Sequence, residues 1–188
     1  ADQLPVKEAG VLTVGTDCAL GKKYTALAIA RTLRERGVNA EFRATGQTGI
    51  MIAGSGMPLD AVVSDFAAGA AEMLSPDAAD DHWDVIEGQG SLFHPAYAGV
   101  SLALLHGSQP DVVVVCHQPG RERVLGHAQF AMPSIEETIA LGGISGPKAG
   151  TVVSKSVFAF NHFVGFTANG YANSNPGAPN GLLIENNV

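Results

Sequence analysis

A glycine-rich stretch near the start of the chain, VGTDCALGKKYT, constrains the fold more than any other feature of this sequence. It follows a short β-branched run at residues 11–14 and precedes apolar residues at helical spacing over residues 22–36, which Gly37 ends. A strand, a glycine-rich turn and a Gly-Lys pair opening a helix occur in the order that phosphate binding requires. We therefore expect the N–H groups of this loop and the helix N-terminus to bind an anionic group.

The loop departs from the usual P-loop pattern, G-x-x-x-x-G-K-[ST]. Thr16 stands where the first glycine belongs, Gly15 comes one residue early, and Lys23 replaces the hydroxyl residue that binds magnesium. Loss of that hydroxyl disfavours ordinary nucleotide hydrolysis, whereas a second lysine suits a ligand with more phosphate charge and no metal. The candidate cofactor-binding residues are Gly15, Thr16, Asp17, Cys18, Ala19, Leu20, Gly21, Lys22, Lys23 and Tyr24.

In the rest of the chain, short apolar runs alternate with segments whose apolar residues recur at helical spacing. Strands are predicted at residues 40–44, 84–87 and 112–116, and helices at residues 59–73, 100–106 and 134–141. Such alternation predicts βαβ units and a mostly parallel sheet in an α/β domain. Because ligands of these sheets bind beyond the carboxyl ends of the strands, the polar residues after each strand are the candidate site.

Composition and charge narrow the range of partners. The chain has 188 residues, of which 46% are hydrophobic and 15% charged, which suits one globular domain over residues 1–188. A net charge of −7 argues against nucleic-acid binding, which needs clustered Lys and Arg. No membrane-spanning run, signal peptide or disulfide framework is recognisable, so we expect a cytoplasmic protein. Residues 142–188, rich in Gly and Asn, offer only residues 151–153 and 157–166 as candidate elements.

Candidate catalytic residues follow the predicted strand at residues 84–87. Glu87 and His94 are alternative general bases, because histidine titrates near working pH and a buried glutamate has a raised pKa. Ser91 is a candidate donor to a developing oxyanion. The histidines lack zinc-ligand spacing, so no resident metal is predicted, although Asp65 and Glu87 would lie near magnesium if the ligand were ATP. For Cys18, we favour a binding role over a covalent one.

Candidate substrate-binding residues follow the other two predicted strands. After residues 40–44, the side chains of Arg43, Thr45 and Gln47 are available to bind a carboxylate. After residues 112–116, His117 and Arg121 lie at the same end of the predicted sheet. We expect a small anionic substrate.

Several segments together resemble the family known as domain of unknown function 1611. They are GTDCALGKKYTALAIARTLRERGV, FRATGQTGI, DFAAGAAE, DHWDVIEGQGSLFHPAYAGVSLALLHGSQPD and CHQPGR. The resemblance implies a three-layer P-loop NTPase-like α/β domain. It also implies acetyl transfer from acetyl-CoA to the amino group of a D-amino acid, D-glutamate in the named members. Members usually carry a further domain before the P-loop domain, and we recognise no such domain in this sequence. We also expect a homo-oligomer.

Two other functions remain open from the sequence. The pattern G-T-D-x-x-x-G-K also resembles the loop of dethiobiotin synthetase, which implies an ATP- and magnesium-dependent ligase or kinase. A non-catalytic nucleotide-binding domain of a larger assembly is the third possibility. If acetyl-CoA is the cofactor, the loop is expected to bind its phosphates, and Lys22 and Lys23 fit that ligand.

Overall fold

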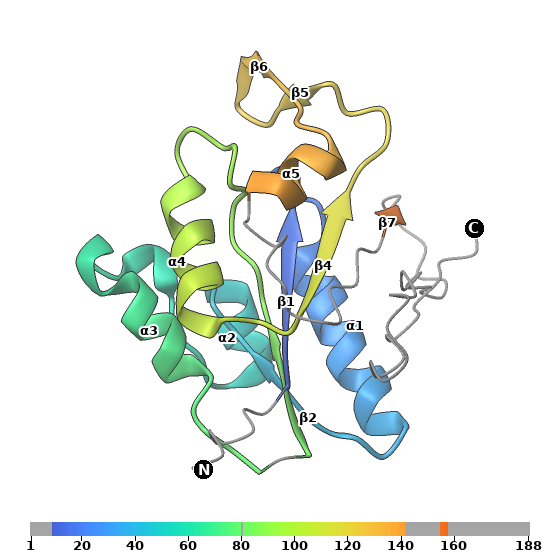
Figure 1. Ribbon diagram of the computed structural model, residues 1–188, viewed down its shortest axis with the longest axis vertical. Helices are drawn as coiled ribbons and strands as arrows, with labels where there is room; N and C mark the ends of the chain where they lie inside the picture. Colours follow the sequence, from blue (N-terminus) through green and yellow to red (C-terminus); the bar gives the residue numbers. More distant parts are fainter. Residues whose placement is uncertain (1–8, 80, 142–154, 158–188) are drawn as a thin grey trace, which may run out of the picture.

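Five parallel strands form the centre of the protein in the computed structural model, which describes residues 9–79, 81–141 and 155–157 (Figure 1). The strands lie in the order β2-β3-β1-β4-β7, and each neighbouring pair runs parallel. Their bounds are β1 Ala9–Gly15, β2 Asn39–Arg43, β3 His82–Ile86, β4 Val112–His117 and β7 Lys155–Val157. Their carboxyl ends therefore lie at one edge of the sheet, as the sequence predicted.

Helices cover both faces of the sheet, which confirms the predicted three-layer α/β class (Figure 1). Successive residues of β1 point to opposite faces, so Val11 packs with α1 (Lys22–Glu35) and Leu12 packs with α4 (Ala98–Ser108). α3 (Ala67–Leu74) lies beside α4 on the second face. Apolar side chains on both faces explain why the strands read as continuous β-branched runs.

The segment predicted as a single helix over residues 59–73 is broken. It forms two short 3-10 turns, η1 (Leu59–Ala61) and η2 (Ser64–Phe66), before α3 begins. Val62 and Val63, which separate the turns, have ψ angles of 137° and 132°, in the extended region that β-branched residues favour. The prediction of one continuous helix was therefore wrong at these two valines.

One helix and a two-stranded hairpin were not predicted. α2 (Gln47–Ala53) begins where the sequence indicated an irregular loop, and β5 (Arg123–Val124) with β6 (His127–Ala131) forms an antiparallel hairpin after β4. α5 (Ile135–Leu141) was predicted. Its capping box is present, because Glu137 N–H donates to Ser134 Oγ at 3.0 Å and Ser134 N–H donates to Glu137 Oε2 at 2.8 Å.

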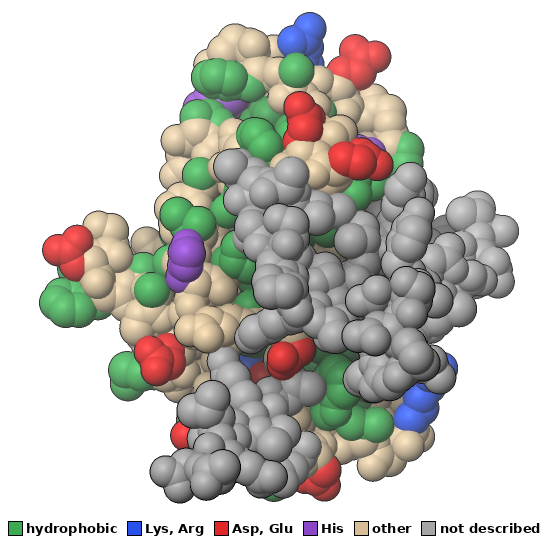
Figure 2. Space-filling view, in the orientation of Figure 1, with side chains coloured by type: hydrophobic (Ala, Val, Ile, Leu, Met, Phe, Trp, Pro, Cys, Tyr) green, Lys and Arg blue, Asp and Glu red, His purple; other side chains and the backbone are tan. Residues whose placement is uncertain are grey.

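The candidate elements at residues 151–153 and 158–166 lie outside the described residues, whereas Val157 ends β7. No helix in the described part of the chain is long and apolar enough to cross a membrane. On the face drawn in Figure 2, acidic side chains are scattered and the few basic ones form no continuous patch. That distribution agrees with the overall negative charge.

Candidate active site

Thr16 joins the P-loop to the loops on either side of it. Its N–H donates to the Cys116 carbonyl at 3.2 Å, and its hydroxyl lies 3.1 Å from His117 Nδ1. Its carbonyl accepts the Ser91 hydroxyl at 3.0 Å. Burial lowers the pKa of His117, although Glu136 opposes this shift, so a neutral ring nitrogen is available to the Thr16 hydroxyl. Thr16, which stands where a P-loop usually has glycine, therefore connects the loop to the end of β4 and to Ser91.

Lys22 lies inside the loop with its ammonium buried. Its Nζ donates to the Asp17 carbonyl at 2.7 Å, and burial lowers its pKa, with opposing contributions from Cys116, Cys18 and Asp17. Gly15 makes room for this side chain, because a Cβ there would lie 3.1 Å from Lys22 Nζ. An anion bound in the loop would therefore meet a poorly solvated positive charge.

The turn into α1 keeps the remaining loop residues in fixed places. Gly21 caps the helix with a φ of 88°, Ala19 has a φ of 53°, and Leu20 is buried. The Thr25 hydroxyl donates to the Gly21 carbonyl at 3.0 Å and accepts the Cys116 thiol at 3.4 Å, so it is engaged as a donor and as an acceptor.

The first turn of α1 presents two candidate cofactor-binding side chains. Lys23 Nζ lies 4.8 Å from the centroid of the Tyr24 ring, and the Tyr24 side chain is exposed. Both residues are therefore next to the loop and accessible to a ligand.

Asp17 connects the loop to the β5–β6 hairpin. Its buried carboxylate accepts the N–H groups of Cys18 and Leu125, each at 2.7 Å, and Arg121 Nη1 lies 3.3 Å from Oδ2. Arg121 also donates to the Cys18 carbonyl at 2.9 Å. The hairpin is thus held against the P-loop by an ion pair and backbone hydrogen bonds.

Glu87 lies directly after β3 and is buried. Its Oε2 accepts the N–H groups of Thr45 at 3.0 Å and Gly46 at 3.2 Å. Burial raises the pKa of Glu87, and these two hydrogen bonds and the nearby lysines oppose that shift. The Thr45 hydroxyl donates to the Glu87 carbonyl at 2.6 Å and accepts from Gln89. The carboxylate is therefore fixed in position and more basic than an exposed one.

His94 is buried beneath the hairpin. Its Nδ1 accepts the Ala96 N–H at 3.1 Å, its other nitrogen lies 3.3 Å from the Leu125 carbonyl, and its ring stacks on Tyr97. These partners assign the ring proton to Nε2. A base role for His94 therefore requires one ring nitrogen to leave its present partner.

Three predicted residues take no part in the hydrogen bonds that join these loops. Arg43 pairs with Asp84 at 2.5 Å and with Glu41 at 3.1 Å. Gln47 begins α2 and is exposed, and Asp65 is exposed on η2. Among the described residues, hydrogen bonds join the P-loop to Ser91, His117, Arg121 and, through Leu125, His94, while a separate set joins Thr45 to Glu87.

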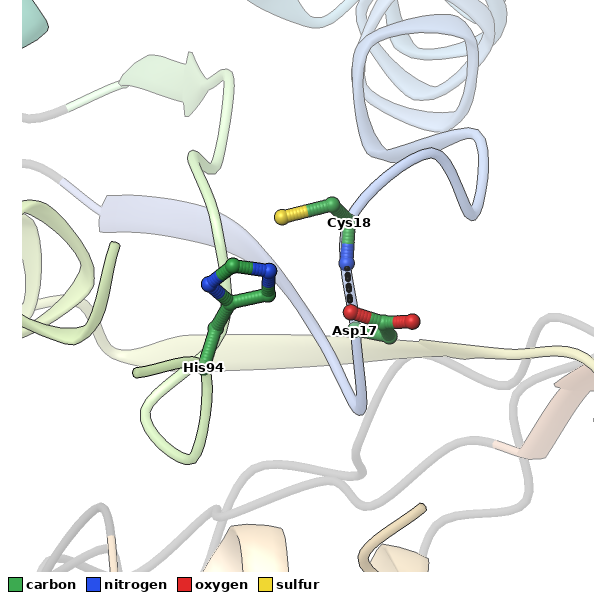
Figure 3. Close-up of side chains that lie close together, drawn as sticks. All are labelled: Asp17, Cys18 and His94. Atoms are coloured by element: carbon green, nitrogen blue, oxygen red, sulfur yellow. Dashed lines mark hydrogen bonds between the residues drawn. The ribbon is translucent and has the colours of Figure 1, made fainter. Parts of the chain in front are cut away.

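The close-up in Figure 3 shows a cluster that sequence reasoning missed. One ligand-type atom from each of Asp17, Cys18 and His94 lies within 4.8 Å of the other two. Cys18 and His94 are far apart in the chain, and spacing carries no signal of such a contact. Leu125, whose backbone contacts both Asp17 and His94, was also missed because it lies on the unpredicted hairpin.

Comparison with known proteins identifies the family. The model for the P-loop domain of DUF1611, a domain of unknown function, matches residues 2–161. This chain belongs to the DUF1611 family. The DUF1611 domain is similar to a crystal structure of a DUF1611 family protein from Anabaena variabilis, with 40% sequence identity and a TM-score of 0.68. That match covers 78% of this chain and 46% of the other chain.

Two curated relatives of this DUF1611 domain carry the name D-glutamate N-acetyltransferase. The protein from Pseudoalteromonas sp is 58% identical over 131 residues, which are 70% of this chain and 40% of the relative. The protein from Tritonibacter scottomollicae is 55% identical over 137 residues, which are 73% of this chain and 41% of the relative. The chain thus spans about two fifths of the length of these relatives.

Proposed function

We propose that this DUF1611 domain belongs to an N-acetyltransferase that moves acetyl from acetyl-CoA to the amino group of D-glutamate. The observation that carries the proposal is the identity of 58% and 55% to two relatives with that name. The active protein is proposed to be a cytoplasmic homo-oligomer that acts on a small molecule.

The P-loop is proposed to bind the phosphates of coenzyme A. The buried Lys22 ammonium lacks a carboxylate partner in its hydrogen bond and donates to a carbonyl, so phosphate oxygens would stabilise its charge. Lys23 adds charge where a magnesium-binding hydroxyl is usual, and the Thr25 hydroxyl is engaged by the helix. These features favour a highly charged ligand that needs no metal over a magnesium nucleotide.

Acetyl transfer to an amine needs a base, because the amino group of an amino acid is protonated at neutral pH. Glu87 is proposed for this role, since burial raises its pKa and two N–H groups hold its carboxylate in place. The N–H groups of the P-loop are proposed to stabilise the oxyanion, because the Ser91 hydroxyl already donates to Thr16.

Arg121 is proposed to bind a carboxylate of the substrate. It lies against the P-loop, where it contacts Asp17 and Cys18. Arg43 pairs with two carboxylates, Asp84 and Glu41, whereas Arg121 pairs with Asp17 alone, so the carboxylate-binding role is moved from Arg43 to Arg121. Gln47, exposed at the start of α2, and His117, the last residue of β4, are proposed to line the same site.

Isothermal titration of the full-length protein with acetyl-CoA, and separately with ATP and Mg²⁺, tests this function. We expect acetyl-CoA to bind, and Lys22→Ala to weaken binding at least about tenfold, or about 1.4 kcal/mol. Arg31→Ala is the matched control, because it removes one positive charge from the exposed part of the same helix. Acetylation of D-glutamate with L-glutamate as comparison then tests the reaction. Mg²⁺-dependent ATP binding without a response to acetyl-CoA would support a ligase or kinase instead.

A further inference from the structure

Cys18 is the least buried residue of the cluster drawn in Figure 3. Asp17 is 0% exposed and His94 is 2% exposed, whereas Cys18 is only half-buried. The Cys18 sulfur, a His94 ring nitrogen and an Asp17 carboxylate oxygen lie within 4.8 Å of one another. A half-buried thiol close to a buried imidazole supplies the nucleophile and the base that covalent acyl transfer needs, although here Asp17 bonds backbone N–H groups and not His94.

We propose that Cys18 carries the acetyl group as a thioester between acetyl-CoA and the acceptor amine, with His94 moving the protons. The inference rests on the proposed N-acetyltransferase function and adds a covalent step to it. In that step the acetyl thioester, and not the phosphates, lies beside Cys18 and Lys22, because these two parts of acetyl-CoA are at opposite ends of its pantetheine arm. The covalent role replaces the binding role that the sequence favoured for Cys18.

The surrounding backbone fixes the nucleophile relative to the imidazole. Asp17 Oδ1 accepts the Cys18 N–H at 2.7 Å, which orients the residue that carries the thiol. Asp17 Oδ2 accepts the Leu125 N–H at 2.7 Å, and the Leu125 carbonyl lies 3.3 Å from His94 Nε2. Asp17 therefore positions both reacting side chains, the second of them through Leu125.

Electrostatics decide how the thiol reacts. Burial raises the pKa of Cys18, and Asp17 adds to that shift, while Lys22 and Arg121 oppose it. The residue therefore rests as a thiol and needs a base in the step that forms the thioester. In the resting arrangement Ala96 N–H donates to His94 Nδ1, so the ring acts after tautomer exchange, when Nε2 has the free lone pair. Ala96 and Leu125 are exposed, so water can bind the two backbone groups that the ring releases.

Cysteine, histidine and aspartate also ligate metals, but the neighbouring charges argue for acyl transfer. Arg121 lies 3.3 Å from Asp17 Oδ2, and the buried Lys22 ammonium bonds the Asp17 carbonyl. These two positive groups stabilise a thiolate or an oxyanion and repel a divalent cation.

The two half-reactions balance. In the first, the Cys18 sulfur bonds to the acetyl carbon, the bond to the coenzyme A sulfur breaks, and His94 transfers the thiol proton to the departing coenzyme A thiolate. In the second, the amine, made neutral by Glu87, attacks the thioester. The bond to Cys18 breaks, and His94 transfers the remaining proton from nitrogen to the Cys18 thiolate. One proton leaves through Glu87, and no oxidant or metal is consumed.

Incubation of the full-length protein with acetyl-CoA and no acceptor tests the thioester. Intact-mass and peptide mass spectrometry should show one acetyl group on Cys18 and one equivalent of free coenzyme A by chromatography. The label should leave on addition of D-glutamate or of neutral hydroxylamine. Initial rates with both substrates varied should follow ping-pong kinetics.

Variants separate a nucleophile from a structural thiol. Cys18→Ala should remove the label and lower kcat at least about 10³-fold, with an unchanged melting temperature. Cys116→Ala is the matched control, because it removes the buried cysteine of β4, and should keep the label. His94→Gln should slow formation of the thioester more than it weakens binding of acetyl-CoA.

The outcomes distinguish the two proposals. If the wild-type protein acetylates D-glutamate and Cys18→Ala does so at a similar rate without label, transfer is direct and the thioester inference is overturned while the function stands. If acetyl-CoA labels Cys18 but D-glutamate does not discharge it, the thioester stands and the proposed acceptor is wrong. Neither label nor turnover would overturn both.

Discussion

At the scale of single residues, the main feature of this site is that an aspartate, a lysine and a glutamate are buried. Asp17, Lys22 and Glu87 are all buried at the carboxyl end of the sheet. The Asp17 carboxylate accepts several donors, whereas Lys22 donates to a carbonyl and Glu87 accepts two N–H groups. Burial shifts the pKa of Lys22 downward and that of Glu87 upward. Both shifts reflect the cost of burying a charge, and a bound anion would stabilise the charge on Lys22.

The raised pKa of Glu87 should make the free energy of unfolding depend on pH. The native state binds the Glu87 proton more tightly than the unfolded state does, so the stability that Glu87 contributes is fully present below the ordinary carboxyl pKa. It is then lost as pH rises through the folded-state pKa. We expect the free energy of unfolding of the wild-type protein, relative to that of Glu87→Gln, to fall as pH rises through this window. The reason is that the amide of the variant stays neutral, while its oxygen can still accept both N–H bonds.

Urea denaturation at a series of pH values measures this difference. Glu72→Gln, at an exposed position on α3, is the control for removal of one carboxyl group. If the free energies of unfolding of the wild-type protein and Glu87→Gln differ by the same amount at every pH in the window, burial does not penalise the Glu87 carboxylate.

Thr16 shows why part of the site was predictable and part was not. The strand, the turn and the Gly-Lys pair are local features, so the P-loop could be placed from the sequence. The role of Thr16 is not local, because its partner Ser91 lies in the loop after β3 and its partners Cys116 and His117 end β4. Only the folded sheet brings them to its carboxyl edge.

At the scale of elements, the sequence predicted those that have a periodic pattern of their own. It missed those that tertiary contacts hold in place. The sequence placed α1, α4 and β4 because each has a long enough pattern of its own. It missed β5 and β6 because the two strands carry little alternation and are held by contacts of Asp17 with Arg121 and Leu125. It joined η1, η2 and α3 into one helix because alanine-rich composition outweighed the two valines between the turns.

The contact between α3 and α4 gives a prediction at this scale. A Cβ on Gly107 would overlap the Ala68 carbonyl oxygen, so Gly107→Ala must push the two helices apart. We expect a loss of about 1–3 kcal/mol in the free energy of unfolding, as for other overpacked sites. Gly99→Ala is the matched control on the same helix, where an added methyl group meets nothing within 4 Å.

Urea or thermal denaturation of both variants measures the effect. Gly99→Ala should leave stability unchanged or raise it by up to about 1 kcal/mol through helix propensity. Equal effects of the two substitutions would mean that the helix pair is not closely packed at Gly107.

At the scale of the whole molecule, the sheet order determines which loops meet. β1 lies between β3 and β4, so the P-loop is flanked by the loop that carries Glu87 and by the loop that carries Arg121. This placement gathers the P-loop, a buried carboxylate and an arginine at one edge. The relatives extend well beyond the region that they share with this chain.

A ligand of this edge should stabilise the whole domain without a metal. Lys23 stands in the usual magnesium-ligand position, and Thr25 is engaged by the helix. We expect acetyl-CoA to raise the melting temperature equally in EDTA and in Mg²⁺, with a stabilisation of about 2.7 kcal/mol when the ligand is at about 100 times its Kd. Differential scanning fluorimetry measures this shift, and Lys22→Ala should reduce it. Dephosphorylated analogues of coenzyme A are the ligand control, because loss of phosphate charge should weaken stabilisation if the P-loop binds those groups. A shift that requires Mg²⁺ would instead indicate that the loop binds its ligand through a metal, as nucleotide-hydrolysing P-loops do.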